Sequence, residues 1–247
     1  MKTTVYKEAR ISIYILAFVI AATLLFYIFA SMFTSVGYKG LRKAKSANAD
    51  VYSDDITIII DAGHGGEDPG AVDNGLIEKE LNLDVALVLN NILISNGYKT
   101  ALTRDEDILL YRQGEENRKK HFDVRNRVEF ANEFEKAIFV SIHMNKFPAT
   151  YCRGLQTFYS ENNAQSKIFA DSIQENSRLL QTDNKRLVKS GNETIYLLEN
   201  LDIPAVLVEC GFLSNKEEAQ RLSDKEYQKA LAFTIYCGLV ECLEKIE

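Results

Sequence analysis

Three nearly unbroken apolar runs constrain the fold of this chain more than any other feature, and they lie at residues 56–60, 138–142 and 205–208. Strands that helices cover on both faces have this composition, because neither face needs polar residues for contact with water. We therefore expect these runs to be central, parallel strands. Shorter and more alternating runs predict three further strands at 99–103, 155–159 and 195–198.

Helical patterns separate these runs. Residues 78–96 place apolar side chains on one face and stop at Gly97, and further helices are predicted at 124–134, 164–180 and 227–245. The segments 214–217 and 223–226 are predicted to cap a short helix and the last helix. This alternation predicts an α/β fold: a three-layer domain with a mostly parallel, six-stranded sheet flanked by helices.

One more hydrophobic helix is predicted near the amino terminus. Residues 11–33 contain no charge and would span about 34 Å as a helix, which is enough to cross the apolar core of a bilayer. The run is longer than the roughly 7–15 apolar residues usual in a signal peptide. We therefore expect a membrane anchor or uncleaved signal at 1–33, a polar linker at 34–55 and one folded domain at 56–247, with cleavage of the anchor left open.

Charge divides the chain at the same place. Residues 1–50 carry 7 Lys and Arg against 2 Asp and Glu, whereas residues 51–247 carry 22 against 33. Such an acidic domain is not expected to bind nucleic acid, which requires a basic surface. Positive charges lie on both sides of the hydrophobic run, so charge alone leaves the orientation of the helix open.

Polar residues with metal-binding or catalytic chemistry lie where the predicted strands end. His64 follows the run at 56–60 within a glycine-rich segment, and His143 follows the run at 138–142. Glu209 ends the run at 205–208, and Glu78 opens the first predicted helix. Ligands gather at the carboxyl ends of parallel strands. Two histidines with one carboxylate are a known set for catalytic zinc and leave one position for water.

Each of these residues also has an ordinary structural explanation. A histidine at a strand end is more often hydrogen-bonded than metal-bound, and the helix dipole favours an acid at a helix amino terminus. Glu209 is harder to explain in this way, because burying a carboxylate costs free energy unless it is paired or metal-bound. The joint occurrence of these residues favours a site. The third histidine, His121, lies in a charge-rich segment and is expected to be a solvated loop residue.

Other polar residues have less specific roles. Asp61 or Asp68 could accept a hydrogen bond from an imidazole ring or serve in a turn. Arg127 could pair with a carboxylate. The candidate substrate-binding residues are Asn145 and Lys189.

Six segments stand in order along the chain, at 61–72, 78–82, 103–107, 127–132, 141–145 and 204–215. Together they resemble the zinc-dependent N-acetylmuramoyl-L-alanine amidase family, type 3. The resemblance implies a six-stranded sheet flanked by helices, one zinc ion per chain held by His64, Glu78 and His143, and Glu209 as the catalytic carboxylate. The implied reaction is hydrolysis of the amide between the lactyl group of muramic acid and L-alanine of the peptidoglycan stem peptide. Glu209 would transfer a proton from water to the leaving amine.

Within that family, segments 154–159, 166–167 and 173–174 are similar to the germination-specific amidases of endospore-forming bacteria. This similarity implies action on the spore cortex, where removal of the peptide precedes formation of muramic-δ-lactam. Because peptidoglycan lies outside the cytoplasmic membrane, it also implies an extracytoplasmic domain, membrane-anchored or secreted, in the forespore intermembrane space or cortex. An activator protein of unknown identity is an implied partner. One departure is that residues 186–189 read Arg-Leu-Val-Lys, where many members have Arg-Gly-x-Lys, so the conformation of this loop stays open.

Two other functions stay open at this point. A zinc peptidase acting within the stem peptide would use the same chemistry, and an inactive wall-binding scaffold would need none of it. The four cysteines show no C-x-x-C spacing and are expected to be free thiols.

Overall fold

The computed structural model describes residues 56–243, and the anchor expected at 1–33 and the linker expected at 34–55 lie outside this range. Within it, no helix is long and apolar enough to cross a membrane. The elements, in chain order, are β1 (Thr57–Ala62), β2 (Val72–Asp73), β3 (Leu76–Ile77), α2 (Glu78–Ser95), β4 (Lys99–Leu102), the 3-10 helix η1 (Glu116–Arg118), α3 (Lys119–Ala131), β5 (Ala137–Asn145), β6 (Gln156–Tyr159), α4 (Ala164–Leu180), β7 (Lys189–Ser190), α5 (Tyr196–Asn200), β8 (Ala205–Phe212), α6 (Lys216–Leu222) and α7 (Lys225–Leu243).

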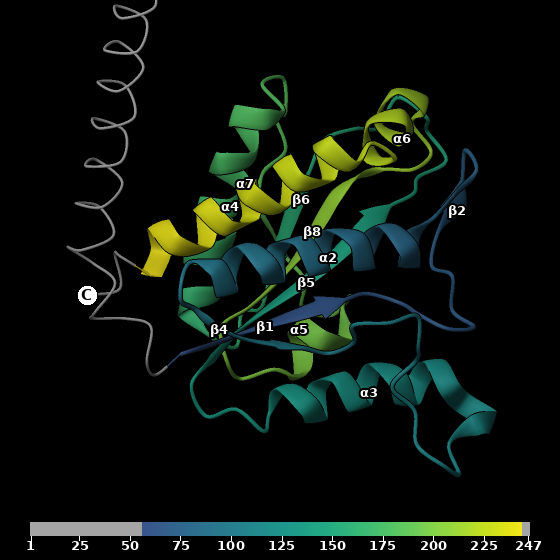
Figure 1. The fold of residues 1–247 in the computed structure, drawn as a ribbon, viewed down its shortest axis with the longest axis vertical. Helices are drawn as coiled ribbons and strands as arrows, with labels where there is room; N and C mark the ends of the chain where they lie inside the picture. Colours follow the sequence, from purple (N-terminus) through teal and green to yellow (C-terminus); the bar gives the residue numbers. More distant parts are fainter. Residues whose placement is uncertain (1–55, 244–247) are drawn as a thin grey trace, which may run out of the picture. The chain divides into compact units, whose positions relative to one another are not determined.

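Six of these strands form one mostly parallel sheet in the order β4-β1-β5-β8-β6-β7. β1 runs parallel to β4 and β5, and β5 runs parallel to β8, whereas β6 is antiparallel to β8. Figure 1 shows α2 and α7 on one side of this sheet and α3 on the other. The predicted three-layer α/β domain with a mostly parallel six-stranded sheet is therefore confirmed.

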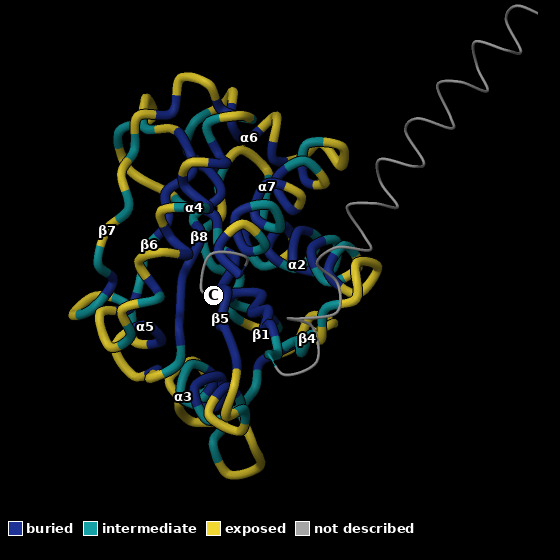
Figure 2. Tube along the Cα trace, turned by 90° about the vertical axis from the view of Figure 1, so that its left-hand side faces the viewer, coloured by how far each residue is buried: buried dark blue, intermediate teal, exposed yellow. Residues whose placement is uncertain are grey.

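The two faces of the sheet explain why the central strands are apolar throughout. In β1, Ile58 and Ile60 join a core cluster with α2, α4 and α7, whereas Ile59 joins a second cluster with α3 and α5. Figure 2 shows β5 and β8 as buried segments in the middle of the domain. Because both faces are covered, successive side chains of one strand enter different apolar cores.

The strand predicted at 195–198 is wrong. These residues begin α5, which starts with Ile195 donating to the carbonyl oxygen of Gly191 and continues with Glu199 donating to Ile195. Leu197 and Leu198 are buried in the second core cluster, so their apolar character is explained by helix packing. The sixth strand is instead β7, which pairs with the end of β6.

Three local predictions are also corrected. The last helix is capped by Asp224, whose Oδ1 accepts from the backbone N–H of Glu226 at 2.8 Å, because α7 begins one residue later than a cap at Ser223 would require. His121 lies in the first turn of α3 and not in a loop, although its side chain is exposed as expected. The cap of α6 shows the same shift of one residue as that of α7, since Asn215, and not Ser214, accepts from two backbone N–H groups of that helix.

The cysteines at positions 152, 210, 237 and 242 are all free thiols. The loop at 186–189 is held through its backbone, because the carbonyl oxygen of Leu187 accepts from Gln156 at 2.8 Å. The side chain of Leu187 itself is exposed. This contact requires no glycine at position 187.

Gly238 sets the distance between α7 and α4. A Cβ atom at this position would lie 2.6 Å from Cα and 2.8 Å from the backbone nitrogen of Ile173. Alanine would favour the helix by about 1 kcal/mol, but displacing a packed helix costs about 1–3 kcal/mol. We expect Gly238→Ala to lower the free energy of unfolding, measured by urea titration. In contrast, Cys237→Ala, at the half-buried neighbouring position, should change it by less than about 1 kcal/mol. Equal stability of Gly238→Ala and the parent chain would contradict this packing argument.

Candidate metal centre

The loop after β1 brings two imidazole rings together. His64 occupies the left-handed backbone region with φ 62°. Gly63 precedes it, and a Cβ atom on this glycine would lie 2.1 Å from Nε2 of His143. Glycine at this position therefore allows the rings of His64 and His143 to approach to 4.9 Å between centroids.

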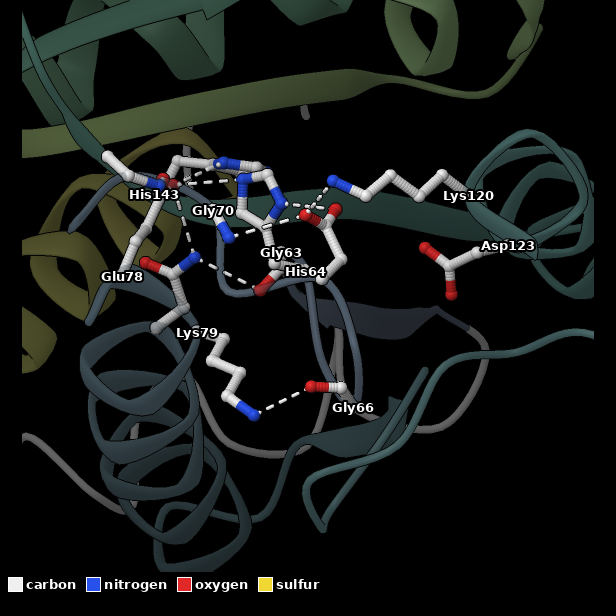
Figure 3. A network of polar contacts seen from close by, with 12 residues as sticks. Gly63, His64, Gly66, Gly70, Glu78, Lys79, Lys120, Asp123 and His143 are labelled. Carbon is white, nitrogen blue, oxygen red and sulfur yellow. Dashed lines mark hydrogen bonds and ion pairs between the residues drawn. The ribbon is translucent and has the colours of Figure 1, made fainter. Parts of the chain in front are cut away.

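The carboxylate of Glu78 contacts both rings (Figure 3). Its Oε1 is 2.9 Å from Nδ1 of His143 and 3.3 Å from Nε2 of His64. One donor atom from each of these three residues lies within 4.8 Å of the others. The carboxylate is fixed by backbone N–H groups, because Ala71 donates to Oε2 at 2.7 Å and Met144 donates to Oε1 at 3.1 Å.

Asp68 orients the ring of His64 from the opposite side. Its Oδ2 lies 2.8 Å from Nδ1 of His64, and its Oδ1 lies 2.6 Å from Nζ of Lys120. A proton on Nδ1 would leave Nε2 of His64 free to bind a metal, an arrangement common among histidine ligands. Of the two roles considered for Asp68, the structure therefore supports that of acceptor for an imidazole.

The electrostatics of this cluster favour a bound cation. Burial lowers the pKa of His64, but Glu78 and Asp68 outweigh that effect and raise it to about 9. Burial raises the pKa of Glu78, but the rings of His143 and His64 outweigh that effect and hold it below its usual range. The two carboxylates thus stabilise positive charge at the point where the imidazole nitrogens meet.

Glu209 lies next to this cluster with an unused acceptor. Its position in β8 is directly beside His143 in β5. Its Oε2 is buried and has no hydrogen-bond partner among residues 56–243. Burial raises the pKa of Glu209 to about 7, with a further increase from Glu78 that the imidazoles oppose. Such a carboxyl group can accept and release a proton near neutral pH.

These residues fit a zinc site with one open position. Two imidazole nitrogens and a carboxylate oxygen match the ligand set of a catalytic zinc centre, which binds water at the fourth position. The unpartnered oxygen of Glu209 is a suitable acceptor for a proton of that water. The structure therefore brings together the four residues that the sequence singled out, from two strands, one helix and one loop.

The other predicted residues lie in different places. Asn145 ends β5, and its carbonyl oxygen accepts from Leu213 at 2.7 Å. Lys189 is exposed on β7 at the edge of the sheet, with β8 and β6 between it and β5. His121 is exposed on α3 and contributes no donor to the cluster.

Two buried arginines that support the loop were not recognised as such from the sequence. Arg104 donates to the carbonyl oxygens of Ala62, at 2.8 Å, and Gly63, at 3.0 Å. Arg127 donates to the carbonyl oxygen of His64 at 2.8 Å. Both side chains are 2% exposed. The sequence indicated a carboxylate partner for Arg127. The contacts of both arginines with backbone carbonyl groups more than 40 residues away produce no local sequence pattern, so the sequence could not predict them.

Asp61 is one of two carboxylate partners of Arg127, whose Nε also donates to Oδ2 of Asp123 at 2.9 Å. The Oδ1 of Asp61 accepts from Arg127 at 2.5 Å and from Thr103 at 2.7 Å, and its Oδ2 accepts from Ser141 at 2.5 Å. Asp61 is fully buried. Burial raises its pKa, but Arg127 and the hydroxyl groups of Ser141 and Thr103 outweigh that effect and hold the pKa below its usual value. Asp61 therefore has a structural role and does not contact an imidazole.

Comparison with known proteins identifies relatives of the whole described domain. The profile of the N-acetylmuramoyl-L-alanine amidase family matches residues 58–241. The germination-specific N-acetylmuramoyl-L-alanine amidase of Bacillus subtilis is 36% identical over 189 residues, which cover 74% of this chain and 78% of that protein.

Solved structures with the same fold are also similar in sequence. The CwlD amidase from Clostridioides difficile, in complex with the GerS lipoprotein, matches with a TM-score of 0.73 and 39% identity, covering 76% of this chain and 98% of that chain. The catalytic domain of CwlV, an N-acetylmuramoyl-L-alanine amidase from Bacillus (Paenibacillus) polymyxa, matches with a TM-score of 0.66 and 31% identity, covering 76% and 98%.

The buried pair of Asp61 and Arg127 leads to a prediction about acid stability. Because the pKa of Asp61 is lowered by folding, its contribution is complete above the ordinary value of 3.8 and is lost as the pH falls through the lower, folded value. Asp61→Asn removes one of the two buried carboxylates paired with Arg127, Asp123 being the other, and should cost about 1–3 kcal/mol at pH 7. Its stability should then fall less steeply than that of the parent chain below about pH 4.

Urea titrations at pH 7, 4 and 3 measure this difference. Asp105→Asn is the control, because Asp105 is exposed in the segment after β4. The control should follow the parent chain at all three values. An Asp61→Asn variant that loses stability with acid as steeply as the parent chain would show that the ion pair does not carry this pH dependence.

Proposed function

The chain belongs to the N-acetylmuramoyl-L-alanine amidase family, and from this premise we propose that it is a zinc-dependent hydrolase acting on spore cortex peptidoglycan. The bond cleaved is the amide between the lactyl group of muramic acid and L-alanine of the stem peptide. His64, Glu78 and His143 hold one zinc ion, and Glu209 is the catalytic carboxylate.

One observation carries the proposal. Three potential ligand atoms lie within 4.8 Å of one another, and the unpartnered Oε2 of Glu209 lies on the strand beside one of them. A buried carboxylate oxygen without a donor is costly in a protein that has no use for it. A water molecule held at the open position of the metal would supply the missing donor.

The residues have separate tasks in the reaction. When bound, zinc polarises the lactyl carbonyl and lowers the pKa of a water ligand to about 7. Glu209 accepts a proton from the attacking water through Oε2 as the C–O bond forms. It then donates this proton to the nitrogen of L-alanine as the C–N bond breaks, because an unprotonated amide nitrogen is a poor leaving group. Asp68 keeps the ring of His64 in one orientation throughout.

The proposed location and partner follow from the substrate and the relatives. Peptidoglycan lies outside the cytoplasmic membrane, so we assign the domain to the extracytoplasmic side, tethered or exported by residues 1–33. The germination-specific relative supports a place in the forespore intermembrane space or cortex. Because the structural relative from Clostridioides difficile is found with the GerS lipoprotein, a lipoprotein is the proposed kind of activator.

Two substitutions separate zinc binding from catalysis. Glu209→Gln should retain one zinc per chain but reduce kcat by at least about 100-fold, because a general acid and base is lost. His64→Ala should lose both zinc and hydrolysis. Zinc content is measured by atomic absorption, and hydrolysis by the release of L-alanine amino termini from purified peptidoglycan with the glycan left intact.

His121→Ala is the matched control, because it removes a histidine that is exposed on α3. It should retain zinc and activity. Normal hydrolysis by Glu209→Gln or His64→Ala would overturn the assigned roles. New amino termini from within the stem peptide would instead identify a peptidase.

The cortex role is tested in spores. We expect cortex from cells without this protein to lack muramic-δ-lactam, since the lactam requires a muramic acid freed of its peptide. Mass analysis of cortex muropeptides measures it, and restoring the parent gene should restore it while the Glu209→Gln variant should not. Unchanged lactam content in its absence would exclude the cortex role and leave the amidase activity standing.

A further inference from the structure

Arg186, in the segment between α4 and β7, has a guanidinium group that is fixed in place on several sides. Its Nε donates to the carbonyl oxygen of Arg153 at 2.6 Å, and its Nη1 donates to Oε1 of Gln156 at 2.9 Å. Its Cζ lies 4.4 Å from the centre of the Phe212 ring. Fixing this part-buried arginine in one conformation costs side-chain entropy, so the arrangement indicates a preformed binding group.

The group lies beside the catalytic carboxylate. Gln156 is directly opposite Glu209 in the pairing of β6 with β8, so their side chains share one face of the sheet. A register shift between His143 and Asn145 then places Phe212 opposite Asn145, on this same face. Arg186 therefore contacts two side chains that flank Glu209, one across the sheet and one along the strand.

The positive charge of Arg186 is not paired with any carboxylate in the range 56–243. Glu218 is close enough to interact with it electrostatically, but its two oxygens accept backbone N–H groups from Gly154 and Phe212. The neighbouring Arg153, in contrast, has a partner in Asp183 at 2.6 Å. A guanidinium group has five N–H donors, and two of those of Arg186 are used by the contacts above. The remaining donors are available to a ligand.

We propose that Arg186 binds the free α-carboxylate of the stem-peptide residue that follows L-alanine, D-glutamate, and thereby sets substrate specificity. This inference rests on the proposed function. In an extended peptide, that carboxylate lies roughly 7 Å from the nitrogen of the scissile amide, from one Cα–Cα step and the bonds at either end. Arg186 holds Gln156, whose position lies directly opposite Glu209, so a stem peptide whose scissile nitrogen meets Glu209 would extend this carboxylate toward Arg186.

Arginine suits this role better than Lys189, one of the two substrate-binding candidates from the sequence. A guanidinium group can bind a carboxylate through two parallel N–H donors while stacking on an aromatic ring. Lys189 is exposed on β7, where its position pairs with Phe158 and not with Gln156. Phe158 is two residues further along β6 than Gln156, the residue opposite Glu209.

The experiment compares two muramoyl tripeptides that differ only in the α-carboxyl of D-glutamate, which is free in one and amidated in the other. Binding to the zinc-loaded full chain is measured by calorimetry in the Glu209→Gln background, which prevents turnover. The free acid should bind about tenfold more tightly than the amide, as a charged hydrogen-bonded pair provides. Adding Arg186→Gln should abolish this preference while leaving affinity for the amide unchanged, and Arg186→Lys should retain part of it.

Arg153→Gln is the matched control, because it removes a positive charge from the adjacent loop whose guanidinium group already has a partner. The Arg153→Gln variant should keep the full preference for the free acid over the amide. Unchanged affinity for the amide shows that the Arg186 variants are folded. Retention of the preference by Arg186→Gln, or its loss in Lys189→Gln, would overturn the inference. If the parent chain releases L-alanine amino termini equally well from the free acid and the amide, only the inference about Arg186 is overturned. If the chain neither binds zinc nor hydrolyses either tripeptide, the proposed function is overturned as well.

Discussion

The buried ion pair of Asp61 and Arg127 joins three parts of the domain that are distant in sequence. Asp61 is the penultimate residue of β1 and also accepts from Ser141 of β5, while Arg127 extends from α3 to the carbonyl oxygen of His64. A charge pair of this kind is expensive to bury unless every donor and acceptor is used. Here Asp61 also accepts from Thr103 and Ser141. Arg127 also donates to Asp123 and to the carbonyl oxygens of Ala62 and His64, so the pair fixes the loop that carries the first candidate ligand.

The other residues of the site lie at the same edge of the sheet as this ion pair, at the carboxyl ends of the parallel strands. β1, β5 and β8 are parallel, so their carboxyl ends lie together, and each contributes one polar side chain to the cluster or its loop. Glu78 completes the cluster because the β2–β3 hairpin delivers the start of α2 to the same edge, where the N–H groups of Ala71 and Met144 hold its carboxylate. The site is thus assembled on strands and helix ends and not on a long loop, which favours a fixed geometry.

Much of the architecture and the cluster could be predicted from the sequence. Unbroken apolar runs identify covered parallel strands, and polar residues immediately after them must meet at one edge. The prediction was wrong at 195–198, because this apolar segment is too short to show the periodicity of a helix or a strand. Burial of Leu197 and Leu198 in the second core cluster selects a helical turn there. It was also incomplete for Arg104, whose partners are backbone carbonyls distant in sequence.

The sequence by itself determined the class of fold, the residues with ligand chemistry and, through six matching segments, the family. Tertiary structure decided which carboxylate pairs with a buried arginine and which one orients the ring of His64. Asp61 and Asp68 lie three residues before and four residues after His64, yet Asp61 pairs with Arg127 and Asp68 with the imidazole ring. It also joined Arg186, and not Lys189, to Gln156, the residue opposite Glu209 in the sheet. The physical reason is that strand pairing and burial set distances between residues remote in the chain, whereas residue type and spacing set only the chemistry available.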